Sequence, residues 1–263
     1  MIDQQSIKEF RRNGYVVTEQ LFSAAEVKFY IDHYTTMREA GSYPGDKDIP
    51  YSRMVHMHRW DDTSLRFMLD KRLANWVRAL TDTEPYAVQS MVYLKPPGSL
   101  GQALHQDQYY LRTGPGSCIA AWVALDPSDE ENGCLQVVAG SQDLPLLCTE
   151  TADMTQTHTG ITVPVPDGME IVPLIMAPGD VMFFNGSVIH GSYNNVSKDR
   201  FRRAVVAHYV TAQAERVAQG YHPVLRMDGS VVELEVSEKG GPCGIWVDRD
   251  GSPDVEMVEP TAE

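Results

Sequence analysis

The sequence predicts a mainly β fold with N-terminal helices, an α+β arrangement in which the helices pack on one side of a jelly roll or barrel. The first observation behind this prediction is helical periodicity over about residues 1–82. The second is a change of period at about residue 85, after which short β-type runs alternate with turns to about residue 212. The third is that 263 residues with 43% hydrophobic content can bury one large core, and no repeat or linker divides the chain. We therefore predict a single domain over residues 1–263.

Three helices are predicted before the β region. Asp3 can cap the first helix, and Asn13-Gly14 is a typical end for it. Ser23 and Glu26 form a capping box at the start of the second helix. The third helix is expected over about residues 63–80, because apolar residues recur there at helical spacing.

The β region follows as short runs separated by turns rich in Pro, Gly, Asn and Asp. The predicted strands are Ala87–Leu94, Cys118–Leu125, Cys134–Val138, Val181–Phe184 and Ala204–Val210. Residues 225–232 predict a hairpin with a tight Asp-Gly turn. Two segments without periodicity, 41–60 and 149–170, are expected to form loops at the mouth of the barrel. We interpret the second as a lid, because loops of that length in compact domains are usually functional or disordered.

Charge and composition exclude several classes of protein. A net charge of −14 argues against nucleic acid as a partner, since phosphate binding needs clustered Lys and Arg. Without an apolar stretch long enough to cross a bilayer, no membrane association is expected. The N-terminus lacks the pattern of a secretory signal, which favours a cytoplasmic location. The sequence makes no prediction about the oligomeric state.

Cysteine usage and the C-terminal charge complete this picture. The four cysteines, Cys118, Cys134, Cys148 and Cys243, show no CxxC spacing or regular pairing, so we expect reduced, mostly buried thiols in a cytoplasmic protein.

From residue 213 to residue 263 there are eleven acidic residues against four basic ones. This acidic extension is interpreted as a solvated, solubilising tail.

The residues with the clearest chemistry are His105, Asp107 and, 85 positions further on, His190. Two imidazoles and one carboxylate can occupy one face of an octahedral metal and leave the opposite face open, as in non-haem Fe(II) oxygenases. Residues two apart on a β-strand point the same way, so we expect His105 and Asp107 on one strand and His190 on a neighbouring strand. A His-x-Asp pair alone is weak evidence, and the ordered set is what supports a metal site.

A permanent cation near such a site could bind a carboxylate in a bidentate manner, through two parallel hydrogen bonds. Arg202 and Arg203 are the candidates, and only one of them can point into the barrel because neighbours on a strand face opposite sides. Both alternating sets contain small or apolar residues, so alternation alone does not decide between the two arginines.

Several stretches resemble the phytanoyl-CoA dioxygenase (PhyH) family. They are MVYLKPPG (91–98), HQDQYY (105–110), CIAAWVALDPSDEENGCLQVVAGSQ (118–142) and APGDVMFFNGSVIHGSYNNVSKDRFRRAVVAHYV (177–210). The resemblance spans about residues 85–210 and is weaker in the N-terminal helices. It implies a double-stranded β-helix, a cupin-like jelly roll that uses Fe(II), 2-oxoglutarate and O2.

The resemblance also implies roles for individual residues. His105, Asp107 and His190 resemble the iron ligands. Arg202, the first arginine after Phe201, resembles the residue that binds the distal carboxylate of 2-oxoglutarate. Further pocket positions that the resemblance implies are Ser192, as a second contact to that carboxylate, and Gln102 and Trp122, as residues lining the co-substrate or substrate pocket. The family motif Pro-Gly-Ser-His is replaced by Ala139-Gly140-Ser141-Gln142, so no substrate is carried over.

Candidate substrate contacts follow from their places in the sequence. Met91 and Lys95 lie on one side of the strand that leads to the metal motif, and Lys95 could reach an anionic group. Tyr109 and Tyr110 follow the motif, and one of them should flank the pocket. His58 lies in the loop expected at the barrel mouth. The remaining histidines, including His208, are interpreted as hydrogen-bonded structural residues.

These residues predict an Fe(II)- and 2-oxoglutarate-dependent hydroxylase that oxidises an unactivated C–H bond and releases succinate and CO2. The presence of Asp107 favours hydroxylation over halogenation, because related halogenases lack this carboxylate. The sparse Lys and Arg near the predicted mouth, together with the strong negative charge of the chain, favour a small neutral or zwitterionic metabolite over a CoA thioester with its phosphates. The alternative is a cupin-like metal-binding isomerase or sensor, which would keep the metal ligands but would not need Arg202 or 2-oxoglutarate.

Overall fold

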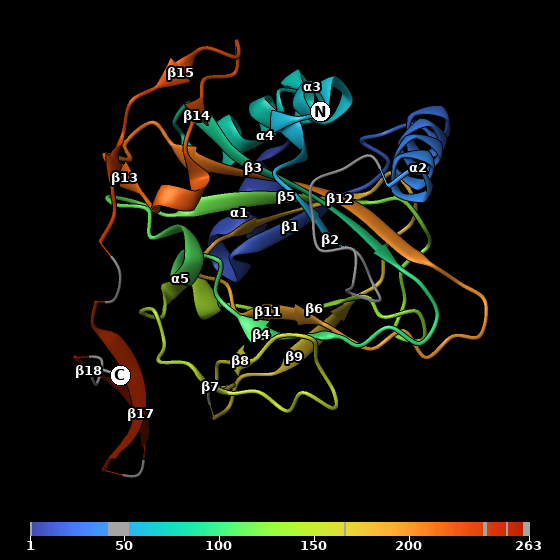
Figure 1. Ribbon diagram of the computed structural model, residues 1–263. Helices are drawn as coiled ribbons and strands as arrows, with labels where there is room; N and C mark the ends of the chain where they lie inside the picture. The colour runs from blue at the N-terminus through green and yellow to red at the C-terminus, as the bar shows by residue number, and fades with distance from the viewer. Residues whose placement is uncertain (1, 42–52, 166, 239–240, 251, 260–263) are drawn as a thin grey trace.

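Two β-sheets face each other and form the body of the molecule in a computed structural model that describes residues 2–41, 53–165, 167–238, 241–250 and 252–259 (Figure 1). The large sheet runs in the order β1-β10-β5-β12-β3-β14-β15, with β2 also paired to β3. The small sheet runs β4-β11-β6-β9. This is the jelly roll that the sequence predicts. The large-sheet strands are β1 (Tyr15–Thr18), β2 (Arg53–Val55), β3 (Pro85–Lys95), β5 (Cys118–Ala124), β10 (Val181–Asn185), β12 (Arg202–Thr211), β14 (Val224–Leu225) and β15 (Val231–Val232); the small-sheet strands are β4 (Gln102–His105), β6 (Leu135–Val138), β9 (Ile171–Leu174) and β11 (His190–Ser192).

Alternation along the central strands explains how the large sheet is buried on both faces. In β5, Ile119, Ala121 and Val123 pack in the cluster that includes the helices, whereas Ala120 and Trp122 pack toward the small sheet. All five side chains are almost fully buried. The inner face therefore carries the residues that can line a cavity between the sheets, and the outer face stabilises the fold.

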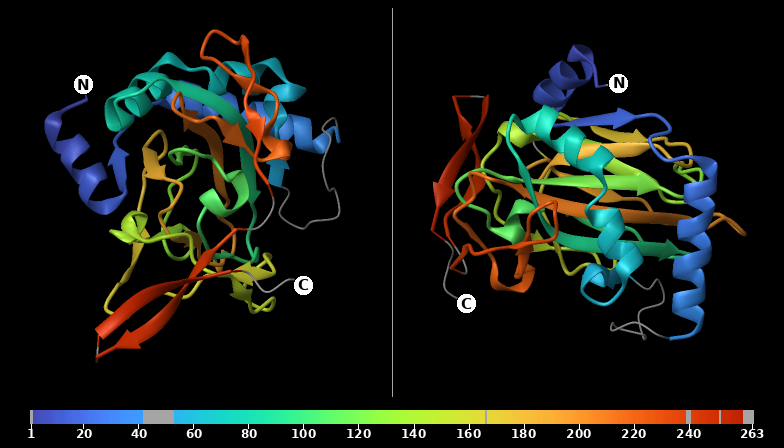
Figure 2. Two further views of the ribbon diagram at one scale, coloured as in Figure 1. Left: turned by 90° about the vertical axis from the view of Figure 1, so that its left-hand side faces the viewer. Right: turned by 90° about the horizontal axis from the view of Figure 1, so that it is seen from above.

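Helices α1 (Gln4–Asn13), α2 (Ala24–Glu39), α3 (Asp62–Met68) and α4 (Lys71–Thr81) pack against the outer face of the large sheet, as the right-hand view of Figure 2 shows. Asp3 caps α1 and the Ser23–Glu26 capping box starts α2, as predicted. The single helix predicted over 63–80 is wrong, because Asp70 accepts a hydrogen bond from the backbone of Arg72 and begins α4 as a separate helix. No helix among the described residues is both long and apolar enough to cross a membrane.

The interpretation of residues 213–263 as a solvated tail is wrong for most of the described part. The predicted hairpin forms as β14 and β15 and extends the large sheet at β3. Val217, Val224 and Val232 are buried in a cluster that also contains Leu111 and Cys118. Apolar residues spaced between the acidic ones thus hold this segment on the body of the molecule. The short elements here are β13 (Arg216–Val217), β16 (Glu235–Val236) and the 3-10 helix η3 (Gln219–Tyr221).

The last two strands, β17 (Cys243–Arg249) and β18 (Ser252–Val258), form a hairpin that projects from the body (Figures 1 and 2). A disulfide between Cys148 and Cys243 ties this hairpin to the chain that follows the small-sheet strand β6. The prediction of four reduced cysteines is therefore wrong for this pair, whereas Cys118 and Cys134 are free and buried as expected. The disulfide removes the argument from reduced cysteines for a cytoplasmic location. That location stays a prediction from the N-terminal sequence.

We expect the disulfide to keep the hairpin attached. With Cys148 changed to Ser, the contacts that remain among the described residues are backbone hydrogen bonds of Gly244 and a few apolar contacts, so detachment should become roughly 30-fold more populated, equivalent to about 2 kcal/mol. Limited trypsin digestion reports this, because Arg249 is exposed on β17 and becomes cleavable when the hairpin detaches. The control Cys134→Ala keeps the disulfide and should be cut at the parental rate. Equal cleavage of the parent and Cys148→Ser would contradict the expectation.

The remaining described elements are short. They are α5 (Gln108–Leu111), β7 (Glu150–Thr151), β8 (Ile161–Thr162) and the 3-10 helices η1 (Met57–Arg59) and η2 (Ser141–Asp143). β7 and β8 pair within the segment 149–170, and Thr159, Gly160 and Ile161 line the central cavity. The segment thus covers the cavity as a folded hairpin, and whether it moves as a lid stays a prediction. Residues 42–52 of the predicted mouth loop lie outside the described residues.

Candidate metal and co-substrate site

His105, Asp107 and His190 converge on the inner side of the small sheet. One ligand atom from each lies within 4.8 Å of the other two, and all three residues are buried. His105 ends β4 and His190 begins β11, and these two residues are directly paired across the two strands. The prediction that the second histidine comes from a neighbouring strand is confirmed.

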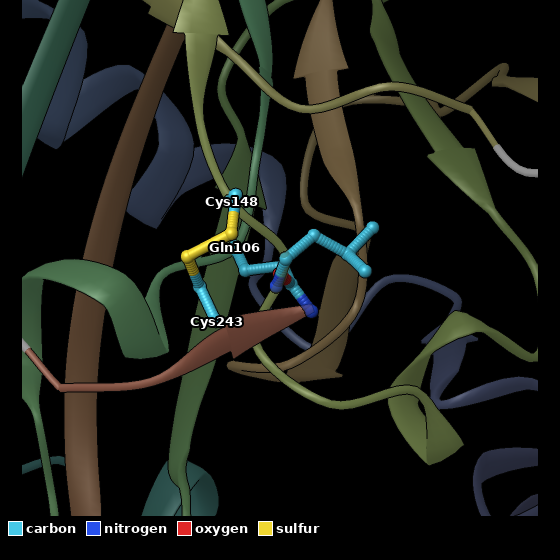
Figure 3. The surroundings of a disulfide bond; sticks show 4 residues. Gln106, Cys148 and Cys243 are labelled. Carbon is cyan, nitrogen blue, oxygen red and sulfur yellow. A yellow bond between two sulfur atoms is a disulfide. The ribbon is translucent and has the colours of Figure 1, made fainter. Parts of the chain in front are cut away.

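Asp107 does not lie on the strand of His105, so that part of the prediction is wrong. Its backbone is helical, with φ −59° and ψ −32°, at the start of α5. The side chain of Gln106 explains the turn: its amide nitrogen donates to the carbonyls of Ser187 and Pro145, and its oxygen accepts from the backbone of Leu147. Gln106 therefore anchors the chain between the two candidate ligands, and Figure 3 shows it beside the Cys148–Cys243 disulfide.

Hydrogen bonds to the backbone set the orientation of both imidazoles. The Nδ1 atom of His105 lies 2.9 Å from the carbonyl oxygen of Ala103, and Nδ1 of His190 lies 3.0 Å from that of Val188. With the proton on Nδ1, each ring presents the lone pair of Nε2 to the site. Burial, followed by the nearby His105, lowers the pKa of His190 to about 4, so this ring is neutral at ordinary pH. Neutral imidazoles are the form that binds a metal.

Asp107 supplies the negative charge. Its burial alone would raise the pKa, but the imidazoles of His190 and His208 beside it lower the pKa well below its ordinary value. The Oδ1 atom lies 3.5 Å from Nε2 of His105 and 3.8 Å from Nε2 of His190, which places it toward the ligand face. The side chain of Gln102 also points toward the ligand face, and its amide nitrogen lies 3.0 Å from Nε2 of His105. That amide must turn aside when a metal takes the Nε2 lone pair.

The donor set fits Fe(II). Two neutral imidazoles and one ionised carboxylate on one face are the ligands of non-haem iron oxygenases, and the three ligand atoms are close enough to share one ion. The second ring nitrogen of each histidine is already held by the backbone, so the site is oriented before any metal binds.

Arg202 lies at one end of the cavity. Side chains alternate along β12, and this alternation shows which of the two arginines points into the barrel. Arg202 is 3% exposed and points inward, whereas Arg203 points outward to an ion pair with Asp126. The Nε atom of Arg202 donates to the carbonyl of Gly133 at 3.0 Å, and its Nη1 atom is buried with no hydrogen-bond partner in the described structure. The guanidinium lies 5.5 Å from the ring centroid of Trp122, so this aromatic wall holds it in place.

A second buried basic side chain lies beside Arg202. Lys95 is 4% exposed, and its Nζ atom donates to Ser192 Oγ at 3.3 Å and to the carbonyl of Tyr193. Burial, with a smaller effect of Arg202, lowers the pKa of Lys95 to about 6. Neither Arg202 nor Lys95 has a carboxylate partner among the described residues. A buried guanidinium is costly unless it is paired, and the amine of Lys95 can take up a proton beside an anion, so this corner is built for an anionic group.

A cavity of about 350 Å³ joins the metal ligands to this cationic corner. Of the residues predicted from the sequence, Met91, Gln102, Tyr110, Trp122, Ser192 and Arg202 line it together with the three candidate ligands. Lys95 lies in a small adjoining hollow that Gln102, Ser192 and Arg202 share. Tyr109 and His58 lie outside the lining, and the ring of His58 is held 2.9 Å from Ser90 Oγ. We therefore withdraw His58 and Tyr109 as pocket residues.

The sequence argument missed other residues that line the cavity. Gln89 and His208 come from adjacent positions of β3 and β12, and Arg53, Tyr93 and Tyr221 complete one wall. Period-2 alternation could have found Gln89 and Tyr93, since they share a face of β3 with Met91 and Lys95. Arg53 lies in the segment already expected at the barrel mouth, but no local signal in the sequence shows that its side chain, or that of Tyr221, faces the cavity.

Known proteins with this architecture identify the family. The sequence profile of the phytanoyl-CoA dioxygenase (PhyH) family matches residues 10–204. Phytanoyl-CoA dioxygenase 1 of Oryza sativa subsp. japonica is 30% identical over 198 residues, which cover 74% of this chain and 69% of that protein.

Solved structures show the same fold. The epimerase SnoN, in complex with Fe3+, α-ketoglutarate and nogalamycin RO, has a TM-score of 0.67 and 24% identity over 81% of this chain and 84% of its own. EctD from S. alaskensis, with 2-oxoglutarate and 5-hydroxyectoine, has a TM-score of 0.65 and 24% identity over 81% of this chain and 78% of its own. The family match and the His-Asp-His site together show that the chain belongs to the phytanoyl-CoA dioxygenase (PhyH) family and is a dioxygenase that uses iron and 2-oxoglutarate.

Proposed function

We propose that this dioxygenase hydroxylates an unactivated C–H bond of a small metabolite and releases succinate and CO2. The observation that carries the proposal is the buried guanidinium of Arg202 with the buried amine of Lys95 beside it, both without a carboxylate partner in the described structure, at one end of the cavity that also holds the three candidate ligands. A keto-dicarboxylate such as 2-oxoglutarate has the chemistry to join them: one end chelates a metal, and the other end is a carboxylate.

Each residue then has a defined task. His105, Asp107 and His190 hold Fe(II), and Arg202 with Ser192 binds the distal carboxylate of 2-oxoglutarate. Lys95 supports this end, because its Nζ atom already lies 3.3 Å from Ser192 Oγ. Gln102 and Trp122 line the space between the two ends.

The bound iron supplies the activation of O2, coupled to decarboxylation of 2-oxoglutarate. The protein's own residues do the rest. Arg202 and Lys95 fix one end of 2-oxoglutarate, which leaves its keto-acid end toward the ligand face. Met91, Trp122 and Val206 form apolar walls that exclude water from the reacting centre. The side of the cavity away from Arg202 holds the metabolite.

The size of the cavity and the net charge of the chain support a small substrate. At about 350 Å³ it accommodates 2-oxoglutarate and a compact second molecule. Beyond the co-substrate end, its polar lining includes Gln89, Tyr110 and Tyr221. With a net charge of −14, the chain is poorly suited to the phosphates of a CoA thioester. A neutral or zwitterionic metabolite therefore fits better.

The cupin-like isomerase or sensor that the sequence left open has no use for the cationic corner. Such a protein would need the metal ligands alone, and burying the unpaired guanidinium of Arg202 beside the amine of Lys95 would only destabilise it. Arg202 and Lys95 therefore favour the oxygenase.

The proposal is tested by mixing anaerobic apo-protein with Fe(II) and 2-oxoglutarate and recording the visible metal-to-ligand charge-transfer band. The parent protein should show the band, and His105→Ala should lose it because one of the three ligands is removed. Tyr109→Phe, outside the cavity lining, should retain it. Bound iron without any band in the parent would overturn the use of 2-oxoglutarate at this site.

A further inference from the structure

His208 is a fourth imidazole beside the candidate iron ligands. It is 4% exposed and lies on β12, six positions after Arg202 and on the same inward face. Its Nε2 atom lies 3.1 Å from Oδ2 of Asp107. β12 pairs with β5 on one side and β3 on the other, so the residue is anchored at the centre of the large sheet.

The two oxygens of Asp107 face different partners. Oδ1 is directed at the two histidine ligands, at 3.5 and 3.8 Å from their Nε2 atoms. Oδ2 is directed at His208. The register of β12 against β3 shifts between His208 and Tyr209, and such irregularities re-aim side chains next to functional sites.

In the described structure, the ring of His208 makes its hydrogen bond to Asp107. Its Nδ1 atom is buried without a hydrogen-bond partner. Donation to a carboxylate oxygen requires a proton on Nε2, and in the neutral ring this tautomer leaves Nδ1 as an acceptor. The ring is therefore placed for Asp107 and for no other described side chain.

We propose that His208 is a positioning residue that holds Oδ2 of Asp107, so that the carboxylate binds the metal through Oδ1 alone. A carboxylate can bind a cation through one or both oxygens. Binding through both would occupy a further coordination position, and 2-oxoglutarate and O2 together need the whole open face. His208 thus keeps that face open. The inference depends on the proposed metal site and goes beyond it by naming what fixes the ligand geometry.

The test compares three variants by anaerobic Fe(II) titration of apo-protein. His208→Leu removes the donor and should weaken Fe(II) binding about 10- to 100-fold, the usual effect of losing a group that holds a metal ligand. His208→Gln places an amide nitrogen near the position of Nε2 and should restore most of the affinity. His58→Leu is the matched control, because His58 is also buried close by but contacts Ser90 and lies outside the cavity lining.

A second measurement separates positioning from general damage. Co(II) absorption in each variant reports the coordination number, which should change in His208→Leu and return in His208→Gln. Thermal unfolding of the metal-free proteins shows whether the leucine variants are folded. Parental Fe(II) affinity and Co(II) spectrum in a folded His208→Leu protein would overturn the inference. If the parent itself binds no Fe(II), the proposed metal site fails instead.

Discussion

Replacing Arg202 with glutamine is expected to weaken 2-oxoglutarate binding roughly 100-fold while iron binding is retained, because truncating one partner of a buried charge pair costs about 2–5 kcal/mol. Arg202 is 3% exposed, and its Nη1 atom has no hydrogen-bond partner in the described structure. The incoming carboxylate would satisfy that atom. The contacts of Arg202 are with Gly133, Tyr93 and Trp122 and not with the three candidate ligands, so Fe(II) affinity should stay near the parental value.

Arg203→Gln is the matched control for this experiment. The residue is next in the chain and equally cationic, but it points outward and pairs with Asp126 at 2.6 Å. Its loss should leave the affinity for 2-oxoglutarate unchanged. The measurement is titration of the charge-transfer band with 2-oxoglutarate at saturating Fe(II). Equal affinities of the two variants would show that the guanidinium of Arg202 does not bind the co-substrate.

The sequence was sufficient to predict the fold where local pattern and burial agree. All five predicted strands form. Four of them lie in the large sheet, where their apolar residues face packed layers on both sides, and β6 packs Leu135 and Val137 of the small sheet against the inner layer. The helix over 63–80 was predicted as one because its apolar spacing continues across Asp70. The capping hydrogen bond of Asp70 is a single local interaction that the periodicity conceals.

The candidate site could be predicted as a set of residues but not as a geometry. Motif order identified His105, Asp107 and His190, and the family pattern chose Arg202 over Arg203. The helical backbone of Asp107 was missed because Gln106 sets it through contacts with residues 39 and 81 positions away. His208 was interpreted as structural because nothing in its neighbourhood in the sequence signals Asp107, which lies 101 positions earlier.

The errors at the C-terminal end share one cause. Cys148 and Cys243 are 95 positions apart and are paired by the return of the β17–β18 hairpin to the small-sheet side. The prediction of a tail over residues 213–263 rested on charge alone, yet Val217, Val224 and Val232 are buried against the body. Composition reports the average of a segment, whereas attachment depends on a few apolar residues and one covalent bond.

Lys95 should make 2-oxoglutarate binding depend on pH. Burial, with a smaller effect of Arg202, lowers the pKa of Lys95 to about 6, so in the free protein the amine is mostly neutral above that pH. A carboxylate bound beside it favours the ammonium form and raises this pKa in the complex. Binding of 2-oxoglutarate above pH about 6 therefore takes up a proton, and below that value Lys95 is charged in both states.

The sign of the effect follows from this proton uptake. As the pH rises above about 6, the affinity for 2-oxoglutarate should fall by up to roughly tenfold per pH unit until the pKa of the complex is reached. Lys95→Met should bind more weakly and without this dependence, because it has no proton to take up. Lys95→Arg keeps a charge throughout the range and should also lose the dependence. These affinities are measured at saturating Fe(II), so that the histidine ligands stay metal-bound at every pH. A parental affinity that is flat across the same range, or a Lys95→Met variant that keeps the parental slope, would show that Lys95 is not the group that titrates with co-substrate binding.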